Sequence, residues 1–156
     1  MRVQLCVVGR LRTGPERALI DDYLDRFGKT GRALGLGPAT EHEVEDRKGG
    51  GMAADAALLS RAVPAGAALV ILDERGEELT SPDFAARIAR FRDSGRQDLA
   101  LLIGGADGLD PALRARADLA IRFGRMVWPH MLARVMLAEQ LYRAATILAG
   151  SPYHRV

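Results

Sequence analysis

The sequence lacks features that several protein classes require. Its 156 residues include a single cysteine, Cys6, so an internal disulfide framework is excluded. The apolar runs 69–72 and 99–103 are far shorter than the roughly 20 residues that span a bilayer. Residues 1–5 pass straight into a strand-like pattern, without the apolar core and cleavage site of a signal peptide. These absences predict a cytoplasmic protein with no membrane segment.

Signatures of several chemistries are also missing. His42, His130 and His154 are widely scattered, and no Cys/His cluster has metal-ligand spacing. The sequence contains no G-x-S-x-G elbow, no G-x-G-x-x-G fingerprint and no G-x-x-x-x-G-K-[ST] loop. Cys6 lies in an apolar strand pattern without a cationic neighbour, which favours a buried, inert thiol. We therefore expect no metal site, no nucleophilic hydrolase and no dinucleotide-dependent oxidoreductase.

The composition that remains is that of one folded domain, residues 1–156, with 48% hydrophobic and 27% charged residues. The net charge of +2 is unevenly distributed, because residues 111–156 hold seven Arg against two acids, a balance of +5, and residues 1–110 carry −3. Of the 22 basic residues, 20 are Arg, whose guanidinium forms forked hydrogen bonds to phosphate and stacks on bases. An RNA partner is one interpretation, and a solvated arginine-rich face is the other.

Strand and helix patterns alternate along the chain, which predicts an α/β fold with a mainly parallel sheet and helices on both faces. Continuous apolar runs indicate buried strands, and a Pro in the first turn after a polar residue indicates helix starts. Residues 73–76 are expected to end the strand that begins at residue 67. The expected strands are 3–8, 40–44, 67–72, 99–103 and 119–123. Two expected helices start at 13–16 and at 80–83, two more cover 53–63 and 131–148, and a short segment lies at 110–116.

Ligands of open α/β sheets bind beyond the carboxyl ends of the strands. Three loops leave those ends here, at 72–76, 103–108 and 123–130. Gly104 and Gly105 have no side chain, so a flat ligand can approach their backbone closely and hydrogen-bond to it. The alternative for both glycines is an ordinary sharp turn.

The last segment offers further candidates. His130 and His154 are the histidines best placed to meet a substrate, although a structural histidine is the commoner role for His130. The tail joins Tyr153, His154 and Arg155, which suits an unpaired nucleotide, and a frayed terminus is the alternative. Arg134 is a candidate phosphate contact.

The helix 131–148 carries an apolar stripe that is too wide for one buried face. A second packing surface, most simply the same helix in a symmetric dimer, would account for that width. Glu139 and Arg143 are four residues apart on this helix and are expected to pair as an ordinary surface contact.

Four motifs then occur in order near the end of the chain. They are LLIGGADGL at 101–109, WPHMLARV at 128–135, EQLYRA at 139–144 and PYHR at 152–155. With the strand at 4–9, they resemble the bacterial ribosomal large-subunit methyltransferase H family of the SPOUT class.

The resemblance implies a SPOUT-type α/β fold with a C-terminal trefoil knot, a homodimer, and S-adenosylmethionine as methyl donor. It also implies methylation of N3 of a pseudouridine in 23S rRNA, on the large ribosomal subunit or the assembled ribosome. The matching cofactor positions are Leu72, Gly104, Phe123, Gly124, Arg125, Met126, Val127 and Trp128, with Gly105 adjacent.

Methyl transfer from a sulfonium depends mainly on alignment, which fits the missing catalytic signatures. The N3 proton must still leave. We expect His130 or His154 to accept it and Arg143 or Arg155 to stabilise the resulting anion, with Glu139 structural. The tail would serve the active site across the dimer interface. The alternative function is a non-catalytic ribosome-associated module that holds RNA with the same basic segment. The expected RNA contacts are Arg134, Tyr153, His154 and Arg155.

Overall fold

The computed structural model describes residues 1–45 and 48–154. Five strands form one sheet in the order β2-β1-β4-β3-β5, and all four neighbouring pairs are parallel. The predicted α/β class with a parallel sheet is confirmed. The strands are β1 (Arg2–Val8), β2 (Ala39–Val44), β3 (Ala68–Glu77), β4 (Asp98–Ile103) and β5 (Leu119–Ile121). The helices are α1 (Pro15–Gly31), the 3₁₀ turn η1 (Arg32–Leu34), α2 (Gly51–Ala62), α3 (Ser81–Asp93), α4 (Pro111–Arg116) and α5 (His130–Ala149).

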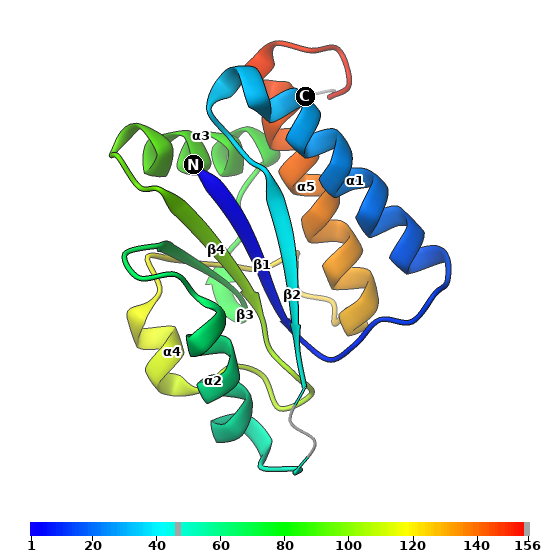
Figure 1. Ribbon diagram of the computed structural model, residues 1–156, viewed down its shortest axis with the longest axis vertical. Coiled ribbons are helices and arrows are strands. Elements are labelled where there is room, and N and C mark those ends of the chain that lie inside the picture. Colours follow the sequence, from blue (N-terminus) through cyan, green and yellow to red (C-terminus); the bar gives the residue numbers. More distant parts are fainter. Residues whose placement is uncertain (46–47, 155–156) are drawn as a thin grey trace.

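Helices cover both faces of the sheet, as the alternation of strands and helices predicted (Figure 1). Alternate residues of each strand point to opposite faces. Leu5 and Leu101 therefore pack in a core with α1, α3 and α5, and Cys6 and Leu102 pack in a second core with α2 and α4. Cys6 is fully buried in that second core. The result is three layers around the central strands β1 and β4.

The helix boundaries follow from local chemistry. The Thr80 hydroxyl accepts a hydrogen bond from the Asp83 amide at 3.2 Å and so caps α3. By contrast, Gly14 precedes α1 as its N-cap residue and offers no side-chain cap, and Pro15 occupies the first turn. Helix α5 ends where Gly150 takes the left-handed conformation with φ 70°.

The expected end of the third strand at 73–76 is wrong. Strand β3 continues to Glu77, and both Leu72 and Glu77 pair with Ile121 of β5, so the residues between them leave the ladder as an irregularity. A Cβ on Gly76 would lie 2.6 Å from the Ile121 backbone, and only glycine fits this close approach. Strand β5 stops at Ile121, so Phe123 lies in the loop that follows it.

A polar contact joins the first strand to the fourth. Arg2 of β1 and Asp98 of β4 are register partners, and their side chains form two hydrogen bonds of 2.9 Å. Burial raises the pKa of the Asp98 carboxyl, but the hydrogen bonds from Arg2 and Gln4 outweigh it and lower the pKa overall.

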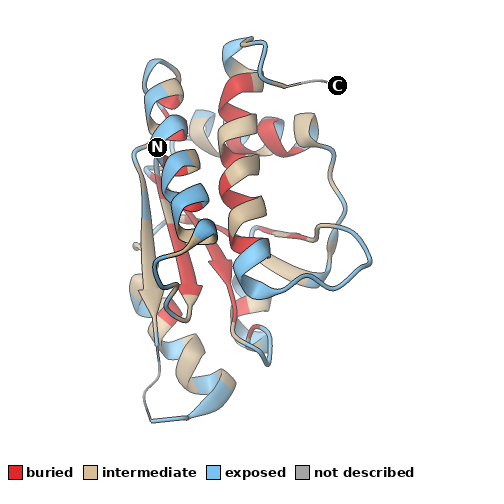
Figure 2. Cartoon of the chain, turned by 90° about the vertical axis from the view of Figure 1, so that its right-hand side faces the viewer, coloured by how far each residue is buried: buried red, intermediate tan, exposed pale blue. Residues whose placement is uncertain are grey.

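Helix α5 packs along α1 and α3, with buried positions over most of its length (Figure 2). Its first three residues, His130 to Leu132, are exposed. The trefoil knot implied by the resemblance stays a prediction.

Candidate functional site

A cavity of about 810 Å³ opens at the carboxyl ends of β4 and β5, beside residues 72–75 in the irregular part of β3. Residues of all three segments expected to bind a ligand line it, although 72–76 is an irregular part of β3 and not a loop after it. The cavity therefore gathers segments that are far apart in the chain. Its lining includes every expected cofactor position, namely Leu72, Gly104, Gly105, Phe123, Gly124, Arg125, Met126, Val127 and Trp128.

The glycine loop is closed on itself. The Gly108 amide donates to the Gly105 carbonyl at 3.0 Å, and a Cβ on Gly104 would lie 2.7 Å from the Gly108 carbonyl oxygen. A Cβ on Gly105 would lie 2.9 Å from an Asp55 carboxylate oxygen. The sharp turn thus needs glycine at position 104, where a side chain would meet backbone, whereas at position 105 it would meet only side-chain atoms of Asp55 and Val8. The same turn presents its backbone to the cavity.

The side chain of Trp128 holds the loop that follows β5 in place. Trp128 Nε1 donates to the Phe123 carbonyl at 3.1 Å, which closes the loop between β5 and α5. Met126 and Val127 lie between Phe123 and Trp128 and are 80% and 94% exposed, respectively. Such exposure is unusual for apolar side chains of this size. His130 begins α5, is exposed and lines the cavity.

Charged side chains in the cavity wall form a feature that sequence reasoning missed. Asp73, directly after Leu72, has an 8% exposed side chain, and its Oδ1 accepts a hydrogen bond of 2.8 Å from the Arg75 amide. Arg114 of α4 approaches it, with Nε 3.9 Å from Asp73 Oδ2. The position of Asp73 beside an expected cofactor contact was the only signal available in the sequence.

The tail residues form a separate cluster against the C-terminal half of α5. Arg143 donates to Glu139 Oε1 through Nε at 3.0 Å, so the expected pair is present. The Tyr153 hydroxyl donates to the same oxygen at 3.1 Å, and its ring centroid lies 4.5 Å from that of Tyr142. Burial, followed by the nearby Glu139 charge, raises the pKa of Tyr153 to about 12. Tyr153 is therefore packed against the helix, with 37% of the residue exposed.

The two other candidates in the tail are His154 and Arg155. His154 Nδ1 is buried and has no hydrogen-bond partner among residues 1–45 and 48–154. Arg155 lies outside the described residues. His130 and Arg143 are 13 residues apart on one helix, which corresponds to about 20 Å along its axis. One chain therefore does not bring the cavity and the tail cluster together.

Arg134 is engaged inside the chain. It is 5% exposed, its Nη1 lies 2.7 Å from a Glu43 oxygen, and its Nη2 donates to the Gly9 carbonyl at 3.1 Å. A phosphate would have to break these contacts to reach it. Phosphate binding by Arg134 stays a prediction, and the cavity does not require it.

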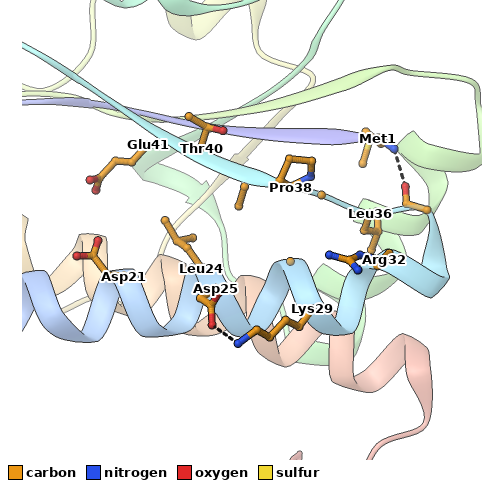
Figure 3. A pocket seen from close by; sticks show the side chains of 14 residues that line it. Met1, Asp21, Leu24, Asp25, Lys29, Arg32, Leu36, Pro38, Thr40 and Glu41 are labelled. Atoms are coloured by element: carbon orange, nitrogen blue, oxygen red, sulfur yellow. Dashed lines mark hydrogen bonds and ion pairs between the residues drawn. The ribbon is translucent and has the colours of Figure 1, made fainter.

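A second cavity of about 830 Å³ lies between α1 and β2 (Figure 3). Asp25 and Lys29 of α1 form an ion pair of 2.8 Å at its rim, and Thr40 and Glu41 of β2 line the other side. None of the residues expected to bind a ligand lies there. Neither cavity has a metal-ligand cluster of three or more His, Cys, Asp or Glu among the described residues.

Over residues 1–45 and 48–154, every helix is too short or too polar to cross a bilayer. The fold and the first cavity together define a class, because a family model described as "Predicted SPOUT methyltransferase" matches residues 1–154. The chain belongs to this SPOUT methyltransferase family.

Curated relatives give a more particular match. Three proteins named "Ribosomal RNA large subunit methyltransferase H" align over the full length of both chains. They come from Ruegeria pomeroyi (74% identical), Cereibacter sphaeroides strain ATCC 17023 (72%) and Dinoroseobacter shibae (71%).

Solved structures show the same fold at low sequence identity. A probable methyltransferase from Bordetella pertussis Tohama I has a TM-score of 0.54 at 16% identity, covering 92% of this chain and 96% of its own. A probable methylase family protein from Haemophilus influenzae has a TM-score of 0.52 at 11% identity, covering 99% of this chain and 70% of its own.

Proposed function

We propose that this protein, as one domain acting in the cytoplasm, transfers a methyl group from S-adenosylmethionine to N3 of a pseudouridine in 23S rRNA of the large ribosomal subunit. The observation that carries the proposal is the cavity at the carboxyl ends of β4 and β5, beside the irregular part of β3. It gathers all nine residues expected to hold the donor. The full-length relatives named as ribosomal RNA methyltransferases support the choice of substrate class.

The cavity residues fit this donor. Leu72 and Phe123 offer apolar surface to a flat base, and the glycine loop offers backbone hydrogen-bonding groups without side chains in the way. When bound, S-adenosylmethionine supplies an electrophilic methyl group. The protein then needs only to hold the base in line with that methyl group and to remove the N3 proton.

We assign proton removal to His130 or His154, and stabilisation of the resulting anion to Arg143 or Arg155. A neutral imidazole accepts a proton near neutral pH, and a guanidinium stabilises the anion that forms on the base. His130 lies at the cavity, whereas Arg143 and His154 lie toward the other end of α5. Two chains are needed to combine them, so we propose a homodimer in which the tail of one protomer serves the cavity of the other.

An exposed apolar patch supports this dimer. Met126, Val127, Met131 and Leu132 lie beside the cavity, in the loop after β5 and the first turn of α5. A second copy of the same surface would remove these side chains from water, as a two-fold interface does. The rest of the RNA contact would come from Tyr153, His154 and Arg155 of the tail, through stacking and phosphate contacts.

The test uses large ribosomal subunits from cells that lack this protein. The purified protein with labelled S-adenosylmethionine is expected to methylate one pseudouridine, located by mass mapping of the rRNA. His154→Ala is expected to reduce turnover at least tenfold, and His42→Ala, a histidine bonded to Gln4, serves as the control. An unchanged methylation pattern in the deletion cells contradicts the proposal. Absence of calorimetric binding at millimolar S-adenosylmethionine favours the non-catalytic RNA-binding module.

A further inference from the structure

We propose that Arg114 and Asp73 form the subsite for the amino-acid end of the methyl donor, with Arg114 recognising the carboxylate and Asp73 the ammonium group. The inference rests on the proposed function, because it concerns the same cavity.

The two side chains approach the cavity from different elements. Asp73 lies in the irregular part of β3, and Arg114 lies in α4, the helix that follows the glycine loop. Both line the cavity. They adjoin the segments expected to hold the base of the donor, because Asp73 follows Leu72 and α4 follows the glycine loop. The charged pair is therefore at the right place for the remainder of the same molecule.

Arg114 has an unused donor. Its Nε is buried and has no hydrogen-bond partner within the described part of the chain, although the whole side chain is 27% exposed. Its distance of 3.9 Å from Asp73 Oδ2 allows attraction but is too long for a hydrogen bond. A buried N–H without an acceptor is unfavourable, and a ligand carboxylate would satisfy it with a charge-assisted bond.

Asp73 is fixed in place. Its Oδ1 accepts from the Arg75 amide at 2.8 Å, which leaves Oδ2 facing Arg114 without a short contact to it. A pair of opposite charges that are close but not hydrogen-bonded to each other is complementary to a zwitterion. The ligand's ammonium group would donate to Asp73 while its carboxylate accepts from Arg114.

Other basic groups of the cavity fit this role less well. Arg122 also has a buried, unpaired Nε, but its Nη2 lies 3.1 Å from Glu78 and its Nη1 donates to the Glu74 carbonyl. The Arg75 side chain is largely exposed. Among the cavity residues that the structure describes, Arg114 is the one that combines a buried unpaired donor with an adjacent buried carboxylate.

Calorimetry with three ligands tests the assignment. S-adenosylhomocysteine carries both charged groups, its decarboxylated analogue carries only the ammonium group, and 5′-methylthioadenosine carries neither. Arg114→Gln is expected to weaken binding of S-adenosylhomocysteine about tenfold or more and to leave the other two ligands unchanged. Asp73→Asn, which keeps the Oδ1 acceptor for Arg75, is expected to weaken the first two ligands and leave 5′-methylthioadenosine unchanged.

Controls separate this role from a structural one. Arg116→Gln, on the exposed side of the same helix, is expected to change none of the three affinities. Arg114→Lys retains the charge and is expected to recover part of the affinity for S-adenosylhomocysteine. Equal weakening of all three ligands by Arg114→Gln would overturn the subsite while leaving the proposed function intact. If the unaltered protein binds none of them, both proposals are overturned.

Discussion

Glu43 and Arg134 form an ion pair of 2.7 Å that connects the edge strand β2 to the N-terminal part of α5. The same Glu43 oxygen accepts the Leu11 amide at 2.7 Å, and Arg134 also donates to the Gly9 carbonyl. One carboxylate thereby fixes the loop after β1 against the helix whose first residues line the cavity. The pair adds a polar connection between these elements to the packing of the hydrophobic core.

Removing the Glu43 charge should cost stability in a pH-dependent way. Burial raises the pKa of Glu43, but hydrogen bonds from Leu11 and Arg134 outweigh it and lower the pKa below the ordinary 4.5. Its stabilisation is thus present above pH 4.5 and is lost as the pH falls through the lower, folded-state value. Glu43→Gln should lower the free energy of unfolding by about 2 kcal/mol at pH 7, measured by urea denaturation.

The difference in the free energy of unfolding between the unaltered protein and Glu43→Gln should shrink below pH 4.5. Glu45→Gln is the control, because Glu45 is half exposed and contacts Arg10 only at 3.7 Å. A cost for Glu43→Gln that stays constant from pH 7 into acid would contradict the role of the carboxylate charge.

Gly104→Ala should remove donor binding without unfolding the chain. The added methyl group would lie 2.7 Å from the Gly108 carbonyl oxygen, so the loop must open and distort the cavity wall. We expect at least a tenfold loss of affinity for S-adenosylhomocysteine by calorimetry, with an unchanged circular dichroism spectrum. Gly28→Ala in α1 has open space around it and should bind normally. Normal binding by Gly104→Ala would show that the turn tolerates a side chain.

Leu132→Asp should convert the dimer into a monomer. Leu132 is an exposed apolar residue in the first turn of α5, and a carboxylate there would be buried without a partner in a two-fold interface. Light scattering after size-exclusion chromatography measures the mass. Leu19→Asp, a similarly exposed leucine on α1, should remain dimeric. A dimeric Leu132→Asp protein would place the interface elsewhere.

Two inactive variants should complement each other. In a mixed dimer of Gly104→Ala and His154→Ala chains, the intact cavity of one protomer meets the intact tail of the other. Random pairing makes about half of the dimers mixed, each with one working site, so co-expression should restore about a quarter of the normal activity. Activity measured on ribosomal subunits would stay at background if cavity and tail act within one chain.

Cys6 should resist thiol reagents in the folded protein. It is fully buried in the core beneath α2, and burial raises the pKa of its thiol to about 12. Almost no thiolate exists at pH 8, and the reagent has no access to the sulfur. A chromogenic disulfide reagent should therefore react with the native protein only at its rate of unfolding, and at once in denaturant. Fast reaction of the native protein would mean that this face of the sheet opens.

Strands whose residues are all apolar are predicted well from the sequence. Residues 99–103 are buried on both faces of β4, so the run needs no alternation to be recognised. The cavity was predictable because parallel strands place their following loops at one edge of the sheet. Both inferences depend on local composition and on a general rule of topology.

The remaining features depend on partners that are distant in sequence. The charged end of β3 pairs with Ile121, and Gly76 permits the approach, so composition alone indicated a turn there. Arg134 is buried because Glu43, 91 residues earlier, neutralises it. Tyr153 is ordered through Glu139 and Tyr142, which the pattern of the tail does not reveal.

Because Arg2 of β1 pairs with Asp98 of β4, β1 is synthesised well before the strand that it pairs with. The two residues are 96 positions apart, and β1 has β4 as its inner neighbour in the sheet. At about 5–20 residues per second, translation leaves β1 without that neighbour for roughly 5–20 s. Its apolar side chains must be kept from other chains over that interval. Parallel pairing of such distant strands also predicts slower folding than for a helical bundle of equal length.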